Sequence, residues 1–538
     1  MQSASNTLPT DVNKLTTLVC SLREQVSQQQ TKIDQQSEFI ESILEQIRLA
    51  RQQHFGAHSE RFNVDQLALL FNEAEVIAET EVDELADGDT DSPQAKEESA
   101  CETQVAGYSR KKPGRRALPD HLPRVELIYD IDDADKVCKH GHGALKPIAQ
   151  KVSEQLDIVR AQIRVIQNIR LQYACSRCDH SIKTAKLPPQ PIPGSHATPG
   201  TLAHVAIGKF CDGLPLYRQS KQWERQDIHL PRSTLAHWMI KAGVLIQPLI
   251  NLLRDLMLAG DYIALDETRT QVLKELGKSP QSQSQMWVQY GGYIDQTIIL
   301  FDYDPSRSQD VPVRLLQDFC GYLQTDGFSG YNKVCESNGI TQLGCWAHAR
   351  RKFDEALKSQ KLSSTKRKTS LSVTALHRIQ LLYKLERQWK HLAPEERYRQ
   401  RQLRAVPILT AFRQWLDKHL PLVPPRSALG KAMNYTHKQW DKLIVYTQDG
   451  RLRIDNNAVE NAIRPFVIGR KNHLFSDTVA GTKSNANLYS LIETAKANGL
   501  EPYAYLKTVF TVLPQAQSVE DIEALLPFKP AAELEQAA

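Results

Sequence analysis

Three carboxylates in the sequence could hold metal ions for phosphodiester chemistry. Asp266 and Asp326 each stand at the carboxyl end of an apolar run typical of a β-strand, and Glu460 falls in the first turns of a later expected helix. Ions and ligands collect at strand ends of an α/β sheet. Such a trio could bind two divalent cations about 3.5–4 Å apart, one activating a water or 3′-hydroxyl and the other stabilising the leaving oxygen. Because the chain holds 62 acids, each aspartate alone is more often a cap or turn residue.

Basic residues near these carboxylates could neutralise a scissile phosphate. Asp455 can cap the helix that carries Glu460, which places Arg464 one turn later on the same face. DNA transesterification needs cations beside the phosphate. The candidates are His348, Arg350, Arg351, Arg464 and Lys471. Structural packing is the alternative role for His348.

The residues from 261 onward have a strand-rich pattern that would position the aspartates. Three strands at hairpin spacing are followed by alternating helix and strand, and this order is typical of an RNase-H-like mixed sheet. The expected strands cover residues 262–265, 286–293, 297–301, 322–325 and 342–346, with a helix over 310–320.

Residues 198–244 indicate three short helices ahead of the sheet. Pro199 opens the first and Leu214 the second. Ser233 is the expected N-cap of the third. The pattern resembles a helix-turn-helix, whose recognition helix lies in the major groove of DNA, although any small helical bundle looks similar. The expected DNA contacts are Arg232, Ser233, Thr234 and His237.

Residues 138–178 have the spacing of a zinc ribbon. A Cys-x-x-Cys knuckle and an upstream cysteine with nearby histidines flank residues 152–173, which are rich in Val and Ile as in β-strands. Two knuckles joined by strands hold one tetrahedral ion. His142 gives the chelate more slack than His140, His180 is a further candidate, and a thiol pair without metal is the alternative. The expected ligands are Cys138, His142, Cys175 and Cys178.

Apolar residues repeat every seven positions between residues 12 and 50. β-Branched residues fill the first column, while Leu15 and Leu22 begin the second, and this pattern favours a parallel two-stranded coiled coil. The first column is Val12, Val19, Val26, Ile33, Ile40 and Ile47. We therefore predict a homodimerisation helix, with a single helix packed on its own domain as the alternative.

Length and composition bound the remaining possibilities. The chain has 538 residues, 41% hydrophobic and 24% charged, which predicts roughly two to four globular domains. No window approaches 18 consecutive apolar residues, and residues 1–11 lack the pattern of a signal peptide. We therefore expect neither a membrane-spanning nor a secreted protein. Nine cysteines, an odd number, favour free thiols or a metal site over a disulfide framework.

Charge is strongly segregated along the chain. Residues 73–102 carry twelve acids and one base, and we expect this stretch to be disordered. Because the net charge is +5, the remaining residues carry +16, as in a protein that binds nucleic acid. A Pro-Gly flanked by basic residues could lie in an A·T minor groove, with a solvated linker as the alternative. The basic residues of this arm are Arg110, Lys111, Lys112, Arg115 and Arg116.

Six strings of residues together resemble the insertion-sequence-66 family of DDE transposases. They occur in the family's order, and the resemblance covers nearly the whole chain. The strings are Val152–Asp157, Leu214–Gln219, Leu265–Thr268, Thr325–Tyr331, Gly344–Phe353 and Asp455–Pro465. The resemblance implies a DDE triad of Asp266, Asp326 and Glu460 on an RNase-H-like core.

The resemblance also implies a helical insertion between the last core strand and Glu460. Residues 355–450 fit it, with three expected packing anchors, Trp389, Trp415 and Trp440. Residues 350–404 hold sixteen basic residues against five acids, which suits a DNA-backbone surface; a solvated face is the alternative. At Gly141 the chain departs from the family, which commonly has a cysteine there, so that a histidine would have to replace this zinc ligand.

The expected architecture is a multidomain α/β protein. An RNase-H-like mixed-sheet catalytic core with an all-α insertion follows an N-terminal coiled coil, a zinc-ribbon-like β segment and a helix-turn-helix. The expected domains are 1–60 (coiled coil), 61–117 (acidic linker and basic arm), 118–195 (zinc-ribbon-like), 196–255 (helix-turn-helix), 256–354 (core, first part), 355–450 (helical insertion), 451–483 (core, second part) and 484–538 (C-terminal element).

The resemblance implies a DNA transposase that binds terminal inverted repeats, cuts the 3′ ends and joins the freed hydroxyls to target DNA. The expected cofactors are two catalytic Mg²⁺, which suit oxygen ligands, and one structural Zn²⁺. The expected partners are double-stranded DNA, at least one further copy of the chain and two small accessory proteins, in the bacterial cytoplasm at the nucleoid. A non-catalytic DNA-binding regulator would explain the first 250 residues equally well but leaves the carboxylates without a role, and a nuclease without strand transfer is a third possibility.

Overall fold

The computed structural model describes residues 163–174, 182–293, 296–359 and 370–528, together with helical positions between residues 16 and 47, of which 22–33 is the longest unbroken run. The chain divides into two compact units, residues 90–187 and the remaining residues. Predictions for the acidic stretch, the basic arm and the zinc ligands lie outside the described residues. These are the predictions for Arg110, Lys111, Lys112, Arg115, Arg116, Cys138, His142, Cys175 and Cys178.

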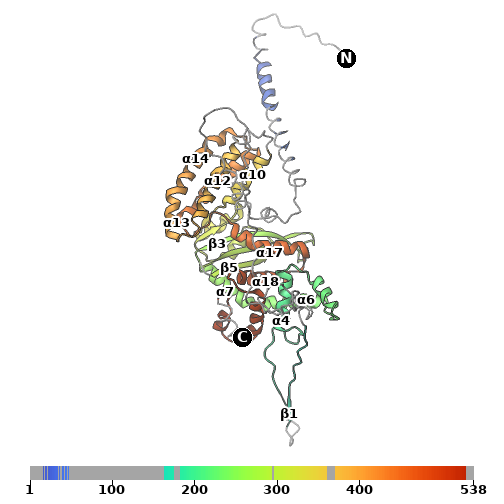
Figure 1. Ribbon diagram of the computed structural model, residues 1–538. Helices are drawn as coiled ribbons and strands as arrows, with labels where there is room; N and C mark the ends of the chain where they lie inside the picture. Colours follow the sequence, from blue (N-terminus) through green and yellow to red (C-terminus); the bar gives the residue numbers. More distant parts are fainter. Residues whose placement is uncertain are drawn as a thin grey trace, which may run out of the picture. The chain divides into compact units, whose positions relative to one another are not determined.

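A mixed sheet lies at the centre of the larger unit (Figure 1). Its described strands are β3 (Tyr262–Lys274), β4 (Gln283–Tyr293), β5 (Gln296–Asp304), β6 (Tyr322–Gln324), β7 (Thr341–Leu343) and β8 (Ser476–Thr478). The order is β5-β4-β3-β6-β7, antiparallel from β5 to β3 and parallel from β3 to β7, while β8 pairs in parallel with the far half of β3. The expected α/β class is confirmed.

The longest strand, β3, corrects one expectation about Asp266. Its apolar run stops at Leu265, so a strand end was expected at Asp266. In the structure β3 continues as a hairpin with β4, and the pairing reaches Gln271 opposite Gln283. Backbone hydrogen bonds to an antiparallel neighbour do not require apolar side chains. The strand therefore extends beyond the last residue of its apolar segment. Asp266 therefore lies within β3, whereas Asp326 follows the end of β6 as expected.

Short helices connect the strands on the parallel side of the sheet. Helix α8 (Asp310–Leu315) lies between β5 and β6, and is shorter than the expected helix. A 3₁₀ turn (Ser329–Tyr331) and α9 (Asn332–Asn338) lie between β6 and β7. Helix α9 ends at Gly339, whose φ of +64° is a left-handed conformation that favours glycine.

Four helices precede the sheet, and the three expected ones are among them. They are α4 (Pro199–Phe210), α5 (Leu216–Glu224), α6 (Arg232–Leu245) and α7 (Gln247–Leu258). Helix α6 has Pro231 at its N-cap position and no side-chain capping hydrogen bond, so the prediction of Ser233 as N-cap is wrong. The fixed φ of Pro231 already directs the chain into the helix, which places Ser233 inside the first turn.

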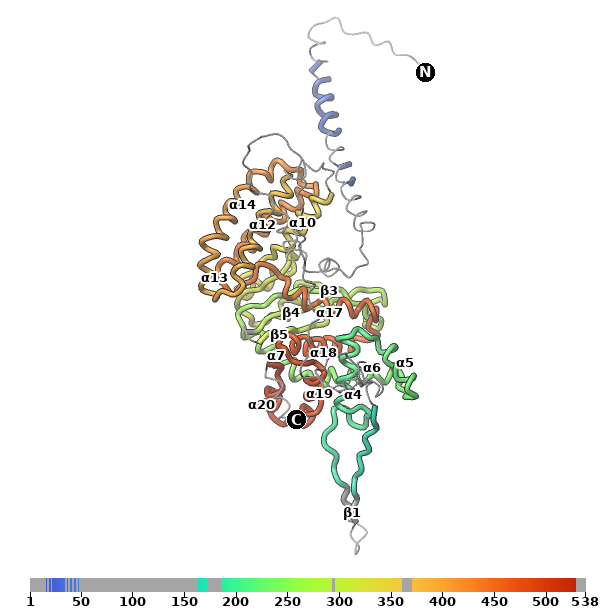
Figure 2. Tube along the Cα trace, in the orientation of Figure 1, coloured from blue at the N-terminus to red at the C-terminus, as the bar shows by residue number. Residues whose placement is uncertain are grey.

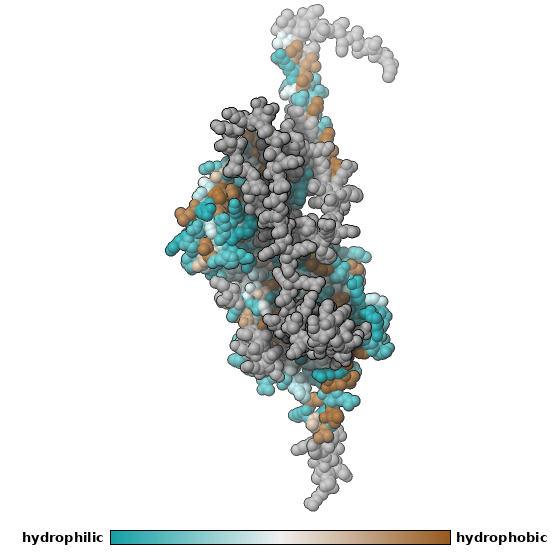
Figure 3. Space-filling view, viewed as in Figure 1, coloured by the Kyte–Doolittle hydropathy of each residue, from teal (hydrophilic) through white to brown (hydrophobic). Residues whose placement is uncertain are grey.

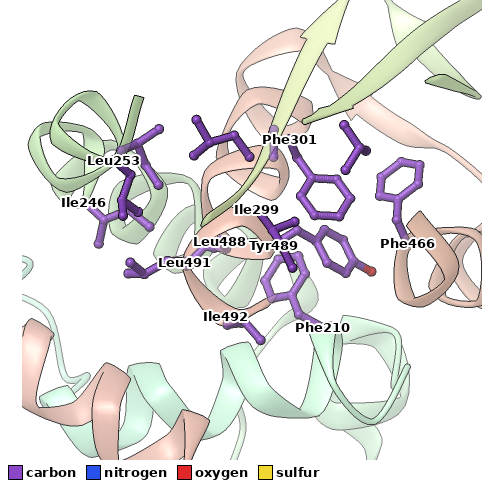
Figure 4. Close-up of a cluster of buried hydrophobic side chains, with 14 of the residues drawn as sticks. Phe210, Ile246, Leu253, Ile299, Phe301, Phe466, Leu488, Tyr489, Leu491 and Ile492 are labelled. Carbon is purple, nitrogen blue, oxygen red and sulfur yellow. The ribbon is translucent and has the colours of Figure 1, made fainter. Parts of the chain in front are cut away.

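The helices before and after the sheet share one hydrophobic core (Figure 4). Phe210 of α4 meets Tyr489 edge-on, with ring centroids 4.8 Å apart. Phe301 of β5 and Phe466 contact the same tyrosine, each at 5.4 Å. The later helices are α17 (Asn457–His473), α18 (Val479–Ala497), α19 (Pro502–Val512) and α20 (Val519–Glu523). Helix α18 packs on β5 and α6, and α19 packs on α4, so the first helices, the sheet and the C-terminal helices form one body.

Helix α18 also satisfies the free edge of β5. Ser490 accepts a hydrogen bond from the backbone N–H of Phe301 at 2.7 Å. Thr494 accepts from the N–H of Ile299 and donates to its carbonyl, both at 3.0 Å, and Asn498 bonds the next outward position in the same way. Side chains four residues apart share one helix face and here match alternate residues of the strand. An edge that would otherwise pair with another chain is thereby covered.

A second hydrophobic core holds the helices between β7 and α17 (Figure 2). They are α10 (Trp346–Ser359), α12 (Leu371–Gln388), α13 (Pro394–Gln400), α14 (Val406–His419), α15 (Ala428–Lys438) and α16 (Trp440–Leu443), with a π-helical turn over Arg401–Ala405. Trp346 contacts Phe412 and Trp440, each with ring centroids 5.9 Å apart. Trp389 and Trp440 are buried and Trp415 packs half-buried on this core, as expected for anchors.

The described N-terminal positions are helical and expose apolar side chains (Figure 3). The described first-column residues are between 45% and 63% exposed, and Leu22 of the second column is 49% exposed. These first-column residues are Val19, Val26, Ile33, Ile40 and Ile47. A helix with an apolar seam open to water is expected to pack against a partner. Self-association of this helix stays a prediction.

The smaller unit contains a two-stranded antiparallel hairpin. Strand β1 (Gln172–Ala174) pairs with β2 (Ile182–Thr184), and Arg170 Nε donates to the carbonyl of Ala185 at 2.6 Å. The expected Cys-x-x-Cys knuckle falls in sequence between these two strands.

Among the helices that the structure describes, none is long and apolar enough to cross a lipid bilayer.

Candidate active site

The register of two parallel strands brings Asp266 and Asp326 side by side. In the pairing of β3 with β6, Ala264 lies opposite Gln324. Each aspartate lies two residues further along, Asp266 within β3 and Asp326 beyond the end of β6, and the two are close enough for Asp326 to raise the pKa of Asp266. Asp266 Oδ1 accepts the N–H of Glu267, and Asp326 Oδ1 accepts the N–H of Phe328, both at 2.8 Å. These hydrogen bonds orient the two carboxylates.

Glu460 comes from the first turn of α17, which packs against β3 and β4. Asp455 Oδ1 accepts the N–H of Asn457 at 3.1 Å, and the N–H of Asn456 donates to Cys345 Sγ at 3.3 Å. Asn456 occupies the N-cap position and the helix has no side-chain capping hydrogen bond, so the prediction that Asp455 caps it is wrong; Asp455 precedes the cap and bonds the first helical residue instead. Both contacts fix the start of the helix and with it the position of Glu460.

The carboxylate of Glu460 is buried, and the basic side chains nearest to it are too far away to donate hydrogen bonds. Glu460 is 2% exposed, and neither of its carboxylate oxygens has a hydrogen-bond partner among the described residues. His348 Nδ1 lies 3.7 Å from Oε1, and Arg351 Nη2 lies 3.9 Å from Oε2, which is too long for a hydrogen bond. A buried carboxylate without donors is costly unless a cation binds it.

The three carboxyl groups share one electrostatic neighbourhood. Burial raises the pKa of Asp266 well above its ordinary value, and Glu267, Glu460 and Asp326 raise it further. Burial raises the pKa of Asp326 as well. The pKa of Glu460 is raised to about 7 by burial, against the lowering effect of Arg351 and with Asp326 among the groups that raise it. Negative charge is therefore concentrated where these side chains meet.

The donor set of this cluster fits a hard divalent cation. Its donors are carboxylate oxygens, which Mg²⁺ prefers over nitrogen and sulfur. The unpartnered oxygens of Glu460 and the raised pKa values of Asp266 and Glu460 mean that a bound cation would stabilise the ionised carboxylates. Asp266, Asp326 and Glu460 are the residues that would hold it.

Sequence reasoning missed a fourth acid in this cluster, Glu267, which follows Asp266 directly. Glu267 accepts hydrogen bonds from Arg307 Nε at 2.6 Å and from the Tyr331 hydroxyl. The Arg307 guanidinium lies over the Phe328 ring, 4.0 Å from its centroid. Glu267, Phe328 and Tyr331 belong to the strings around the aspartates, but no sequence signal marks Arg307, which comes from the segment after β5. The cluster holds a half-exposed guanidinium beside Asp326.

Not all the residues that were expected to supply positive charge around Glu460 are both charged and exposed. Burial, followed by Arg351 and Lys352, lowers the pKa of His348 to about 4, so its ring is neutral and does not supply the expected positive charge. Arg350 is 4% exposed, so the expectation that it contacts DNA is corrected: α10 turns this side chain into the interior. Arg464 acts on Glu460 from the same helix, and Lys471 is exposed further along it.

The helix-turn-helix candidates lie apart from this cluster. Arg232, Ser233 and His237 are exposed in the first turns of α6, and Thr234 is half-buried. The buried side of α6 packs on α18 instead. The four expected DNA contacts therefore lie at the exposed start of one helix.

The helical insertion reaches the loop that follows Asp326. A Cβ atom added to Gly327 would lie 2.6 Å from the Tyr435 ring of α15, so only glycine fits there. Lys352 Nζ lies over the same ring, 4.7 Å from its centroid. The positive charge of Lys352 also acts on Asp326, where it partly offsets the rise in pKa that burial causes. Tyr435, which sequence reasoning missed, thus links the insertion to the aspartate loop.

Family models match most of the chain. The model described as "Transposase IS66 family" covers residues 194–484, and "IS66 C-terminal element" covers residues 490–528. The "zinc-finger binding domain of transposase IS66" covers residues 135–179, and "Transposase C of IS166 homeodomain" covers residues 43–127. The zinc-finger match contains all four expected zinc ligands.

Similar proteins occur in Sinorhizobium fredii. "Uncharacterized protein y4jD" is 32% identical over 76% of this chain and 81% of its own length. "Uncharacterized protein y4qI" is 31% identical over 90% of this chain and 88% of its own length. "Uncharacterized protein y4hP" is 27% identical over 88% of this chain and 86% of its own length. The similarity therefore extends over nearly the whole chain.

Proposed function

Because the chain belongs to the IS66 family of transposases, we propose that it is a DDE transposase that binds the terminal inverted repeats of its element. It cuts the 3′ ends of the element and joins the freed hydroxyls to target DNA. The observation that supports this proposal is the parallel pairing of β3 with β6, which ends two residues before Asp266 and Asp326, together with the mutual influence of Asp266, Asp326 and the buried Glu460 on their pKa values.

The proposed core is RNase-H-like. Its support is the strand order, in which three antiparallel strands are followed by two strands parallel to the first. In this arrangement β3 and β6 position the two aspartates, and α17 brings Glu460 from 134 residues further along the chain. The helices of the long insertion form a core of their own, which is consistent with a triad whose members come from both sides of the insertion in sequence.

Asp266, Asp326 and Glu460 hold two Mg²⁺ in this proposal. The bound ions supply an activated water or 3′-hydroxyl and stabilise the leaving oxygen of the phosphodiester. Asp266 and Asp326 are oriented by backbone N–H groups, so their carboxylates need little rearrangement. Arg351 and Lys352 on α10 and Arg307 beside Asp326 place positive charge where the DNA backbone enters.

Recognition of the element ends is assigned to the parts before the sheet. Arg232, Ser233, Thr234 and His237 at the start of α6 contact bases or phosphates in the major groove, and Lys471 with Arg464 contacts the backbone nearer the triad. The basic arm, from Arg110 to Arg116, lies in an adjacent minor groove.

A structural zinc ion holds the segment before these helices. Its proposed ligands are Cys138, His142, Cys175 and Cys178. The support is the zinc-finger family match and the β1–β2 hairpin on either side of the second knuckle. With Gly141 in place of a ligand, His142 completes the tetrahedral set.

A strand-transfer assay tests the proposal directly. The full chain is incubated with Mg²⁺, a plasmid target and a DNA fragment that carries the inverted repeat flanking the gene. We expect cleavage at the 3′ end of the repeat and covalent joining of that end to the plasmid, both abolished by a chelator. Binding without cleavage would instead identify a DNA-binding regulator, and cleavage without joined product would identify a nuclease. Either outcome contradicts the proposal.

A further inference from the structure

A cysteine, a histidine and the helix glutamate form a cluster that the proposed Mg²⁺ chemistry does not use in full. Cys345 directly precedes α10, His348 lies in its first turn and Glu460 comes from α17. One donor atom from each residue lies within 4.8 Å of the others. Ligands at bond lengths of 2.0–2.3 Å around a tetrahedral ion are about 3.5 Å apart. Closure of the cluster around an ion thus needs a shift of about 1 Å.

Burial raises the pKa of the Cys345 thiol well above its ordinary value, and Glu460 and Asp455 raise it further, so the sulfur carries its proton until a cation binds. Cys345 Sγ accepts the backbone N–H of Asn456 at 3.3 Å and also a backbone hydrogen bond from His348. These two peptide donors from separate segments lower the pKa of the thiol and so oppose the effect of burial, and a bound cation would favour the thiolate further. The N–H groups on either side of Cys345 are held by the carbonyls of Lys442 and Ile454. The sulfur is therefore fixed in place before any ion binds.

The other two members of the cluster carry buried atoms without partners. His348 Nδ1 and both carboxylate oxygens of Glu460 are buried and have no hydrogen-bond partner among the described residues. Nδ1 and Oε1 lie 3.7 Å apart, so they face each other without bonding. Buried polar groups are normally satisfied, and two such atoms that face each other beside the sulfur of Cys345 suit a shared cation.

We propose that Cys345, His348 and Glu460 form a binding site for a thiophilic divalent cation such as Zn²⁺, separate from the Mg²⁺ pair. Thiolate and imidazole select borderline transition metals and reject Mg²⁺. Three protein ligands leave the fourth tetrahedral position to water. The thiol proton of Cys345 is released to solvent when the sulfur binds the ion.

The site has a regulatory consequence that rests on the proposed function. Glu460 belongs both to this cluster and to the proposed Mg²⁺ triad, so an ion bound by Cys345 and His348 withdraws the glutamate from catalysis. Zn²⁺ thereby inhibits strand transfer in the presence of excess Mg²⁺. Glu460 thus binds either Mg²⁺ together with the two aspartates or Zn²⁺ together with Cys345 and His348, and the choice of ion switches strand transfer on or off.

Cobalt(II) spectroscopy of the full-length protein tests the site without relying on activity. Metal-stripped wild type and Cys345→Ser are titrated with Co²⁺, and the thiolate-to-cobalt charge-transfer absorption is recorded. The proposed zinc ribbon contributes equally to both proteins and cancels in their difference. We expect wild type to bind one more equivalent of Co²⁺ per chain with thiolate absorption. Cys335→Ser, a half-buried cysteine outside the cluster, is the matched control and is expected to overlay with wild type.

A second variant tests the site independently, in case Cys345→Ser loses the cobalt band only because it does not fold. Glu460→Gln keeps the shape of the side chain and removes one anionic ligand, and it is expected to weaken the Cys345-dependent Co²⁺ binding at least tenfold while the absorption band persists at saturation. Circular dichroism melts establish that each variant is folded. Identical titrations of wild type, Cys345→Ser and Glu460→Gln would overturn the site.

The outcome separates the two proposals. Strand transfer with Mg²⁺ but no Cys345-dependent cobalt band removes the thiophilic site and leaves the transposase intact. A Cys345-dependent band without any strand transfer removes the proposed function and leaves the metal site.

Discussion

At the scale of single residues, the carboxyl of Glu460 is deeply buried and accepts no hydrogen bond from the part of the chain that the structure describes. Burial raises its pKa from 4.5 to about 7, with Asp455 and Asp326 raising it further and Arg351 and Arg464 lowering it. The metal-free folded protein therefore holds a proton on Glu460 over a pH range in which the unfolded chain has lost it. This difference makes stability depend on pH.

The stability of Glu460→Gln tests this linkage. Below pH 4.5 the group is protonated in both states and has no effect, whereas between pH 4.5 and 7 the folded state binds more protons and stability falls as pH rises. Above pH 7 the full penalty applies, up to about 3 kcal/mol at 1.36 kcal/mol per pKa unit. In a chelator, we expect the glutamine variant to be more stable than wild type at pH 8 and about equal to it at pH 4.5.

Denaturant unfolding at both pH values measures the difference. Asp477→Asn, an exposed acid whose partner Lys274 is also exposed, is the control and is expected to shift stability by less than about 0.5 kcal/mol at either pH. An equal effect of Glu460→Gln at both pH values would show that the carboxyl has no raised pKa.

Sequence strings were sufficient to propose the three carboxylates, but they did not indicate the groups around them. Arg307 reaches Glu267 from a different segment, and nothing in the spacing of the two residues indicates that contact. The neutral state of His348 depends on burial and on the neighbouring Arg351 and Lys352. Such properties arise only after the chain is packed, so the expected cationic role of His348 could not be tested from sequence.

At the scale of elements, the edge of the sheet depends on α18. Thr494 uses one hydroxyl to bond both the N–H and the carbonyl of Ile299. We expect Thr494→Val, which keeps the shape and removes the hydroxyl, to destabilise the protein by about 2–4 kcal/mol, because each buried group left unsatisfied costs roughly 1–3 kcal/mol.

The control for this prediction is Thr410→Val in α14. Its hydroxyl donates to the carbonyl of Val406 at 3.0 Å on an exposed helix face, so water can replace the bond. The expected change is below about 0.5 kcal/mol. Equal free energies of unfolding for the two valine variants would mean that α18 does not satisfy the edge of β5.

Hydrophobic pattern predicted the strands but not their limits. The apolar segments at residues 286–293 and 297–301 correspond to β4 and β5, because a buried strand needs apolar side chains. The polar half of β3 was missed because pairing, not hydropathy, extends it. The start of α6 at Arg232 instead of an N-cap at Ser233 reflects the fixed φ of Pro231.

At the scale of the whole molecule, parts far apart in sequence form one body. Helices α4 to α7, the sheet and the C-terminal helices share a single core. A sequence pattern shows that each helix has an apolar face, but it does not show which faces meet. A separate C-terminal element at residues 484–538 was expected on sequence alone, and we propose instead that residues 484–528 belong to the core, since Tyr505, Leu506, Val509 and Phe510 are buried there.

Dimerisation through the N-terminal helix is a prediction at this same scale. Ile33 and Ile40 are exposed on the described helical positions, and both occupy the first column of the heptad repeat. Lysine at both positions would bury two charges in a coiled-coil seam, so Ile33→Lys with Ile40→Lys is expected to convert a dimeric protein to monomers. Lysine at Gln30 and Ser37, which lie outside both columns, is the control. A monomeric wild-type protein in sedimentation equilibrium would contradict the prediction.

The central claim is that Asp266, Asp326 and Glu460 act together on DNA, and charge-removing variants test it most directly. Asp266→Asn, Asp326→Asn and Glu460→Gln are compared with Asp310→Asn, an acid that is 69% exposed and outside the cluster. Cleavage of a repeat-bearing fragment and its binding are measured on the same preparations. We expect each triad variant to lose about a hundredfold or more in cleavage, since metal ions supply several kcal/mol of transition-state stabilisation, while binding stays near wild type. Full cleavage by any one of the three variants would remove that residue from the site and contradict the account.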